Sequence, residues 1–234
     1  EAECMRQKIP CSISNNWQIE ADINLILGAH LEPGKYIDLD NKRTIFFNLE
    51  RLKSLEENPA TKKYIELLQQ HRYIDFSSEN SEYCRRKGLQ QPIYLYRPWY
   101  DKTWTRTQNE IDKEWDACLI GSITPRREKL AKELNKAGIK TICAFNCYAS
   151  ERDEILSKSK IALNVHAYED SSTAEILRLA YYISNNLNIV SEKSNFEAGE
   201  EEISQHLEQY AYTALIDGVK RELKSIKDIK SNNA

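Results

Sequence analysis

The feature that most constrains the fold is a regular alternation of short apolar runs with helical patterns. The second half of the chain contains four such runs, at residues 116–122, 139–145, 161–168 and 187–192. Helical patterns follow them at 125–136, 150–158, 171–186 and 210–227. Short strands separated by helices are typical of parallel sheets with crossover connections. We therefore expect a Rossmann-like α/β unit in β-α-β-α-β-α-β-α order.

The first half shows a weaker form of the same pattern. Its apolar runs lie at 23–30, 44–50, 73–77 and 92–96, with helical patterns at 60–70 and 78–88. Residues 97–115 have no clean period and predict a link between two lobes. The sequence thus predicts two Rossmann-like lobes, a short N-terminal one at 1–100 and a C-terminal one at 101–234.

Composition narrows the class of protein. The chain has 234 residues and a net charge of −3, so no general attraction to nucleic acid is expected. No stretch approaches the roughly 18 apolar residues of a membrane span, and the first ten residues lack the apolar core of a signal peptide. We interpret the six cysteines as free thiols in a reducing compartment, which predicts a cytoplasmic protein. No zinc site is expected, because Cys143 and Cys147 have no second ligand pair.

The segment GSITPRREKL, residues 121–130, joins an apolar run to a helical pattern. Gly121 and Ser122 directly follow the expected strand, and Thr124 is a good N-cap. Arg126 and Arg127 then fall in the first turn, the unfavourable end of a helix for a cation. One interpretation is a cradle for a diphosphate, since helix starts and arginines both bind anions. The other is a solvated basic turn, and the local pattern alone does not decide between them.

A second candidate anion site lies near residue 175. Ser172 and Glu175 have capping-box spacing, so Glu175 is either a helix cap or a carboxylate that binds a ribose diol. Arg178, one turn later, is placed to pair with Glu175. Four residues would offer backbone N–H groups at this helix start: Ser171, Ser172, Thr173 and Ala174.

Three further polar residues come after expected strands, where ligands bind in open α/β sheets. His166 ends a strand, and its ring is expected to point into the crevice. His30 and Glu50 follow the first two strands of the first lobe. His30 and Glu50 are each a candidate general base or a group that binds an acceptor hydroxyl. The structural alternatives are a satisfied histidine for His166 and His30, and surface polarity for Glu50.

Several segments taken in order resemble a known family. GSITPRREKLAKELNKAGIK, ERDEILSKSKIALNVHAYE and AEILRLAYYISNNLNIVSE resemble the C-terminal half of bacterial and viral group 1-type glycosyltransferases of GT-B architecture. These motifs occur in the order G-S…P-R-R…E-R-D…L-N-x-H…E-x-x-R…V-S-E. This order resembles the pattern of the branch of that family that is involved in surface polysaccharide assembly. INLILGAHL, IFFNLERL and YIDFSSENSEYCRRKG resemble the N-terminal half more weakly. The resemblance covers roughly residues 20 to 225.

This resemblance implies two lobes with the active site between them. It implies transfer of a sugar from a nucleotide-sugar donor to a hydroxyl of a glycan or lipid-linked glycan acceptor, without a tightly bound metal or other cofactor. The C-terminal lobe would hold the donor, with Glu175 on the ribose, and the N-terminal lobe the acceptor. The implied diphosphate contacts are Gly121, Ser122, Arg126 and Arg127. Those arginines and the two helix starts would stabilise the charge of the leaving diphosphate in place of a metal.

The resemblance does not imply a stereochemical outcome. Retaining members often carry two glutamates eight positions apart, and the residue eight before Glu175 is Ala167. His166 would contact the donor sugar or its phosphate. If the reaction inverts, His30 or Glu50 would activate the acceptor hydroxyl. The alternatives are a non-catalytic nucleotide-sugar or carbohydrate-binding module of a larger polysaccharide-assembly protein, and an α/β protein–protein scaffold.

Overall fold

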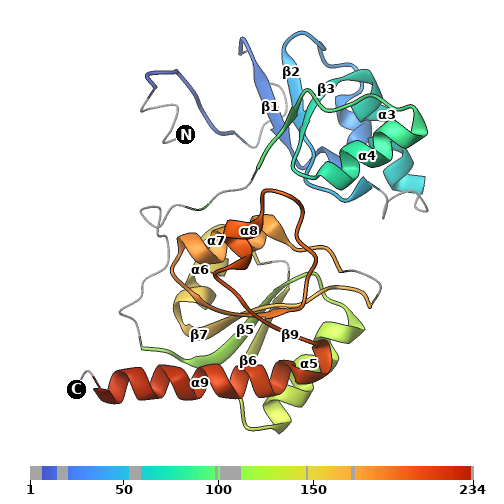
Figure 1. The fold of residues 1–234 in the computed structure, drawn as a ribbon. Helices are drawn as coiled ribbons and strands as arrows, with labels where there is room; N and C mark the ends of the chain where they lie inside the picture. Colours follow the sequence, from blue (N-terminus) through green and yellow to red (C-terminus); the bar gives the residue numbers. More distant parts are fainter. Residues whose placement is uncertain are drawn as a thin grey trace. The chain divides into compact units, whose positions relative to one another are not determined.

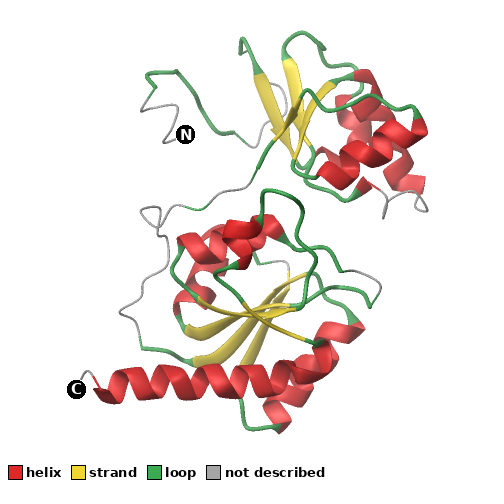
Figure 2. Ribbon diagram, viewed as in Figure 1, coloured by secondary structure: helices red, strands yellow, loops and turns green. Residues whose placement is uncertain are grey.

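The protein is α/β throughout, with one parallel sheet in each of two compact units, residues 1–96 and 97–234 (Figures 1 and 2). The computed structural model describes residues 7–14, 21–52, 59–97, 100, 112–145, 147–169 and 172–232. Two parallel sheets with helical connections are what the alternation of apolar runs predicts.

Unit 1 holds a four-stranded sheet in the order β1-β2-β3-β4. The strands are β1 (Asn24–Leu27), β2 (Thr44–Phe47), β3 (Arg72–Asp75) and β4 (Tyr94–Leu95). Two 3-10 turns, η1 (Ala29–Leu31) and η2 (Pro33–Tyr36), connect β1 to β2. Helices α3 (Pro59–Gln70) and α4 (Ser78–Lys87) follow β2 and β3.

One face of this sheet carries the core of unit 1. Tyr64, Leu67 and Leu68 of α3 pack with Phe46 and Tyr73 of the sheet, and all five are buried. This matches the apolar face that the sequence pattern gives to α3. The ends of α4 are also those expected from sequence, because a serine caps the start of the helix and a left-handed glycine ends it.

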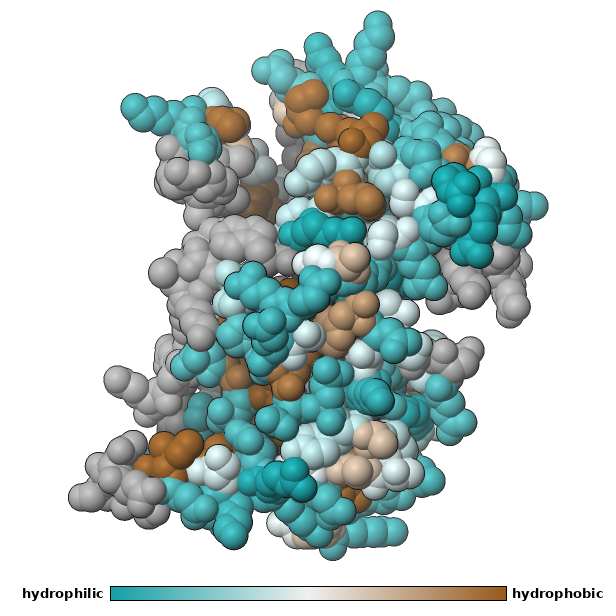
Figure 3. All heavy atoms as spheres, viewed as in Figure 1, coloured by the Kyte–Doolittle hydropathy of each residue, from teal (hydrophilic) through white to brown (hydrophobic). Residues whose placement is uncertain are grey.

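The described parts of the connections in unit 1 leave the other face of its sheet open. Strand order follows chain order, so right-handed crossovers place every connection on the same side. Leu27, Phe47, Ile74 and Tyr94 are aligned in one row of the sheet on the open side. Leu27 is 56% exposed and Leu25, on the same face, is 50% exposed. Figure 3 shows apolar side chains gathered over these strands.

Unit 2 holds a five-stranded parallel sheet in the order β6-β5-β7-β8-β9. The strands are β5 (Trp115–Gly121), β6 (Thr141–Phe145), β7 (Ser159–Asn164), β8 (Asn188–Glu192) and β9 (Glu208–Tyr210). Helices α5 (Pro125–Lys136) and α9 (Leu215–Asn232) cover one face (Figure 1). The other face carries α6 (Ala149–Ser157), α7 (Ile176–Ser184) and α8 (Glu201–Ser204).

The strand order of unit 2 reverses at its first strand. Both β6 and β7 pair with β5, so the chain leaves β5 in one direction and returns on its other side. Crossovers in opposite directions put helices on both faces, which explains why this sheet, unlike that of unit 1, has two covered faces. The reversal creates a switch point at the carboxyl ends of β5 and β7, the place where open α/β sheets bind ligands.

Several predicted boundaries are wrong. The last helix was expected over 210–227, but residues Glu208–Tyr210 form edge strand β9 and α9 spans Leu215–Asn232. Neither α8 nor β9 was predicted, because elements of four and three residues carry no periodic signal. Five cysteines are free thiols: Cys11, Cys84, Cys118, Cys143 and Cys147. The sixth, Cys4, and most of the predicted link at 97–115 lie outside the described residues.

Among the helices within the described ranges, none combines the length and the apolar character needed to cross a bilayer.

Candidate functional site

The first candidate site lies at the switch point of unit 2, where Arg127 joins two strands. Its backbone N–H donates to the Thr124 hydroxyl at 3.3 Å, the expected N-cap bond of α5. Its guanidinium donates from Nε and Nη2 to the carbonyl of Val165, at 3.1 and 2.7 Å. Nη1 donates to the carbonyl of Ser122 at 2.9 Å. Arg127 therefore ties the segment after β5 to the segment after β7, and its side chain is only 2% exposed.

Arg126 is held by a carboxylate of the same chain. It makes a bidentate ion pair with Glu192, which ends β8, and its Nη1 also donates to the carbonyl of His166 at 3.1 Å. The guanidinium carbon lies 3.8 Å from the centre of the Tyr212 ring. The hydrogen bonds that Arg126 donates to Glu192 raise the pKa of Arg126. The anion that compensates this cation at the start of α5 is thus Glu192, a residue of the same chain.

These contacts show which groups surround the two arginines of the expected diphosphate cradle, while diphosphate binding itself stays a prediction. Arg126 and Arg127 were expected to face a bound diphosphate. Instead, the described contacts of both guanidiniums are with groups of the protein itself. The structural reason is that the segments at the carboxyl ends of β5, β7 and β8 meet at this edge. Each of them brings a carbonyl or a carboxylate within reach of the first turn of α5.

The ring of His166 was expected to point into an open crevice, but the structure buries it. Its ring is 1% exposed, and Nε2 lies 3.2 Å from both the carbonyl of Lys193 and the hydroxyl of Ser194. Its backbone N–H donates to Glu192 Oε2 at 3.0 Å. His166 Nδ1 is buried and has no hydrogen-bond partner among the described residues. The histidine links the ends of β7 and β8, which agrees with the structural interpretation.

The expected second helix start is also wrong. Helix α7 begins at Ile176, and Glu175 precedes it without a side-chain capping bond. Thr173 instead forms an isolated parallel bridge with Asn195. The N–H of Ala174 donates to the carbonyl of Asn195 at 2.9 Å, and the N–H of Asn195 donates to the carbonyl of Ser172 at 2.6 Å. These bonds pull the segment into an extended path. Ser171 lies outside the described residues.

A cluster that the sequence did not single out lies beside Gly121. This glycine has φ +143°, and a Cβ placed on it would lie 3.0 Å from Arg127 Nη1 and 3.2 Å from Arg178 Nη2. Arg178 Nη2 lies 3.9 Å from Glu175 Oε2, and its Nη1 donates to Asn164 Oδ1 at 3.4 Å. Two guanidinium groups therefore flank one glycine, with a single carboxylate at long range. Burial, and then the charge of Arg178, lower the pKa of Arg127.

The signal for Arg178 was present in the sequence. Its spacing of three residues from Glu175 was noted, but only as an ion pair. The side chains of Arg178 and Glu175 remain 22% and 43% exposed, whereas Arg127 is buried. Of the arginines in this cluster, Arg178 is the one that a ligand can reach.

The second candidate site lies in unit 1, where the structure brings two predicted residues together. His30 lies in η1 after β1, and Glu50 lies after β2. His30 Nε2 is 3.2 Å from Glu50 Oε1, and both side chains are about one-third exposed (28% and 32%). The sequence offered them as alternatives; the structure places them in contact.

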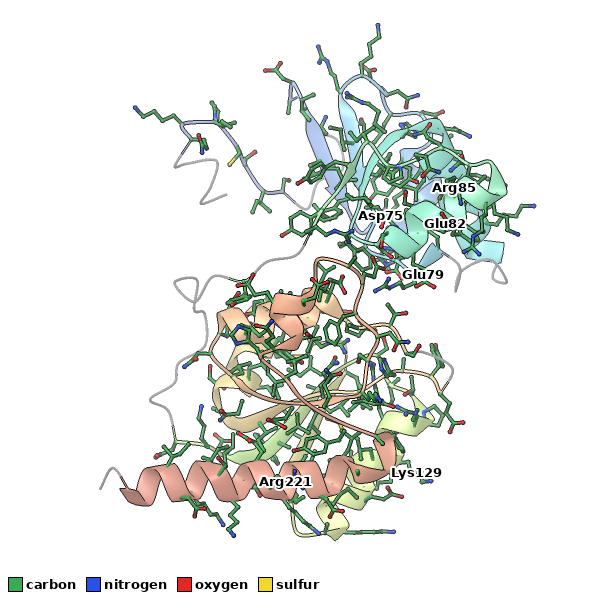
Figure 4. The ribbon with its side chains drawn as sticks, in the orientation of Figure 1. Asp75, Glu79, Glu82, Arg85, Lys129 and Arg221 are labelled. Atoms are coloured by element: carbon green, nitrogen blue, oxygen red, sulfur yellow. The ribbon has the colours of Figure 1, made fainter. Side chains whose placement is uncertain are left out.

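A buried polar network lies directly beneath this pair. The side-chain amide of Asn48 donates to the carbonyl of Glu50 at 2.9 Å and to Asp75 Oδ2 at 2.8 Å. The amide of Asn80 likewise donates to the carbonyl of Glu50 at 2.8 Å and to Asp75 Oδ1 at 3.0 Å. Asp75, labelled in Figure 4, is fully buried, and burial raises its pKa. The loop that carries Glu50 is therefore fixed from below.

Comparison with known proteins gives distant relatives. The chain matches no protein-family model. It is 26% identical over 211 residues to Uncharacterized protein L138 of Acanthamoeba polyphaga mimivirus, a match that covers 83% of this chain and 24% of that protein. It is 30% identical to the same virus's Uncharacterized protein R358 over 123 residues (52% of this chain, 41% of R358). It is 25% identical to Uncharacterized protein L140 of the same virus over 152 residues, a match that covers 64% of this chain and 49% of L140. The match spans less than half the length of each of these relatives.

Proposed function

We propose that this protein is a nucleotide-sugar-dependent glycosyltransferase of GT-B architecture, in which unit 2 binds the donor. The observation that carries the proposal is the pair of guanidinium groups, Arg127 and Arg178, beside Gly121 at the switch point. The resemblance of the sequence to group 1-type glycosyltransferases supports the same assignment, as do two parallel α/β units.

The electrostatics favour an anionic ligand at this point. Two like charges held close together disfavour each other, and a bound anion removes that repulsion. Glu175 offsets only part of the positive charge, because its nearest oxygen is 3.9 Å from Arg178. Gly121 has no side chain, so a phosphate can approach its backbone closely. The planar fork of Arg178 suits bidentate contact with phosphate oxygens.

The roles of the residues follow from their exposure. Arg178 contacts the diphosphate directly, while buried Arg127 adds a fixed positive field and holds the two strand ends in register. Both stabilise the negative charge that develops on the leaving nucleoside diphosphate. Glu175, the more exposed partner, accepts hydrogen bonds from the ribose hydroxyls. Unit 1 binds the glycan or lipid-linked glycan acceptor, and the free thiols fit a cytoplasmic enzyme.

Calorimetric titration with UDP, GDP, CDP and dTDP tests the donor site. We expect one nucleotide to bind, and Arg178→Ala and Glu175→Ala each to weaken it at least tenfold, about 1.4 kcal/mol. Lys129→Ala, an exposed cation on α5 (Figure 4), is the matched control and should bind as the wild type does. Absence of binding to the folded wild type, or equal binding by Arg178→Ala, would refute the donor site.

A non-catalytic nucleotide-sugar-binding module is the alternative. The internal contacts of Arg126 and His166 favour it, because they leave fewer groups of unit 2 for chemistry. The two functions differ in turnover. Release of nucleoside diphosphate from a bound nucleotide sugar supports the enzyme, whereas tight binding without release supports the module.

A further inference from the structure

We propose that the outer side of helices α5 and α9 in unit 2 docks reversibly on an anionic lipid bilayer. The proposal stands on charge and geometry and does not depend on the donor site. The carrying observation is a set of exposed cations on the two helices that cover one side of the unit 2 sheet (Figures 1 and 4). This lysine face comprises Lys129, Lys132 and Lys136 of α5, Lys140 in the segment after it, and Lys220, Arg221, Lys224 and Lys227 of α9.

Helical periodicity turns the lysines of each helix outward. The three lysines of α5 are spaced i, i+3, i+7 and the three of α9 are spaced i, i+4, i+7, so each set lies along one side of its helix. The opposite sides are buried. Leu130 and Leu134 of α5 belong to the same apolar cluster as Leu215 and Val219 of α9. Both rows of lysines therefore point away from one shared core, on the same side of the sheet.

The cations of the lysine face are not neutralised within the described part of the chain, where none of them forms an ion pair. Lysines elsewhere in unit 2 are paired. Lys158 lies 2.9 Å from Glu154, and Lys160 lies 2.6 Å from Asp116. The carboxylates of α5 and α9 are fewer than the cations: Asp217 and Asp228 are exposed, and Glu128, Glu133 and Glu222 are half-buried. The whole chain has a net charge of −3, so positive charge is concentrated on this face.

The chemistry of the face favours a layer of lipid headgroups over other polyanions. All but one of its cations are lysines, which act as point charges, whereas arginine is the residue that binds single phosphates bidentately. Such diffuse positive charge matches the negative potential over a bilayer of anionic phospholipids. Binding of single-stranded nucleic acid uses aromatic side chains on which bases stack, and the sequences of α5 and α9 contain no aromatic residue.

Flotation of the wild-type protein with unilamellar vesicles tests the docking. One set of vesicles is pure phosphatidylcholine, and the other contains about 30 mol% phosphatidylserine. We expect binding to the anionic vesicles at about 50 mM salt, a loss of affinity of at least about tenfold at about 500 mM salt, and no binding to the neutral vesicles. Binding to neither set, or equal binding to both, overturns the inference.

A triple variant tests whether the lysine face is the surface that docks. Lysines 220, 224 and 227 are replaced together by glutamine, and each removed charge should weaken binding to the anionic vesicles about fivefold, about 100-fold in all. The matched control replaces Lys62, Lys63 and Lys87 by glutamine, which removes the same charge from exposed positions on α3 and α4 of unit 1. This control should keep most of the affinity. Equal losses in the two variants would show that net charge governs binding, and would overturn the assignment to this face.

Two further measurements separate this inference from its rivals. A duplex DNA oligonucleotide and polyglutamate are titrated against the wild type under the same conditions, and tighter binding of either one than of the anionic vesicles overturns the lipid assignment. Nucleotide titration of the lysine variant checks its fold. We expect that titration to match the wild type, because Arg178 belongs to α7 on the other side of the sheet. Loss of vesicle binding with nucleotide binding intact is the result that supports the inference, and failure of either proposal leaves the other standing.

Discussion

Replacement of Arg127 by methionine tests the role of the buried guanidinium. Methionine retains most of the aliphatic volume but has no donors and no charge. The carbonyls of Val165 and Ser122 then lose the three charge-assisted bonds that Arg127 makes to them. Both carbonyls lie at the switch point, so the change acts where the strand ends meet.

The magnitude follows from these bonds. A buried acceptor left without its donor costs about 1–3 kcal/mol, which applies to the carbonyl of Val165. The carbonyl of Ser122, an exposed residue, can accept from water instead. Removing a buried charge that lies beside Arg178 returns part of this free energy. We expect a net loss of about 1–2 kcal/mol in the free energy of unfolding of unit 2. Arg127→Lys should lose less, because an ammonium group can still reach one carbonyl.

The assay is urea denaturation followed by far-UV circular dichroism, with hydrogen exchange of unit 2 peptides to assign the transition. The matched control is Arg221→Met on exposed α9 (Figure 4), which should change stability by less than about 0.5 kcal/mol. If Arg127→Met is as stable as Arg221→Met, Arg127 does not hold the two strand ends together. The guanidinium would then have only its role toward the ligand.

Three further predictions follow from buried groups and from one glycine. Burial lowers the pKa of His71, so the unfolded chain takes up a proton near pH 6.5 and the folded chain only at a lower pH. The free energy of unfolding is therefore not reduced by His71 above that pH, and it falls as pH drops below it. In His71→Leu, the urea midpoint should depend less on pH between 7.5 and 5 than it does in the wild type. Asp75→Ala should destabilise unit 1 by about 2–5 kcal/mol in urea melts, since it removes the acceptor of a buried network. The control is Glu79→Ala, because the side chain of Glu79 is exposed and its loss should change stability little. Equal losses of stability in the two variants would contradict this account. Gly121→Ala should lower the free energy of unfolding by about 1–3 kcal/mol through strain at φ +143°, and should weaken nucleotide binding by displacing Arg178. The control is Gly138→Ala, since Gly138 has φ +79° but open space around it. This variant should lose stability in the same melts without any change in nucleotide binding.

Much of the fold of unit 2 is predictable from sequence because its signals are local. Helix α5 spans the predicted residues 125–136, and Thr124 makes the predicted cap. The start of α7 is not predictable in this way. Ser172 and Glu175 have the right spacing for a cap, but backbone bonds to Asn195, twenty residues away, hold the segment extended. A non-local partner overrides a local preference here.

The two candidate sites show the same division. Sequence placed His30 and Glu50 at the ends of neighbouring strands, and parallel pairing of those strands made their meeting possible. It did not show that they touch, nor that Asn48 and Asp75 support them, because these contacts depend on how side chains turn in a packed loop. It placed Arg126 in the right helical turn and missed that Glu192, sixty-six residues later, would neutralise it.

Sequence alone thus determined the class of fold, the order of most elements and the edge of each sheet where polar groups collect. These depend on periodicity, caps and the direction of parallel strands, all of which act over a few residues. Only the tertiary structure decided which cations remain available to a ligand. Arg126 and Arg127 are occupied by groups brought from distant strands, while Arg178, noted in the sequence only as a partner of Glu175, stays partly exposed beside Gly121. An arginine is available to a ligand only where no group of the protein already pairs with it. Which arginines are paired depends on contacts between residues far apart in the sequence, and these form only in the folded chain.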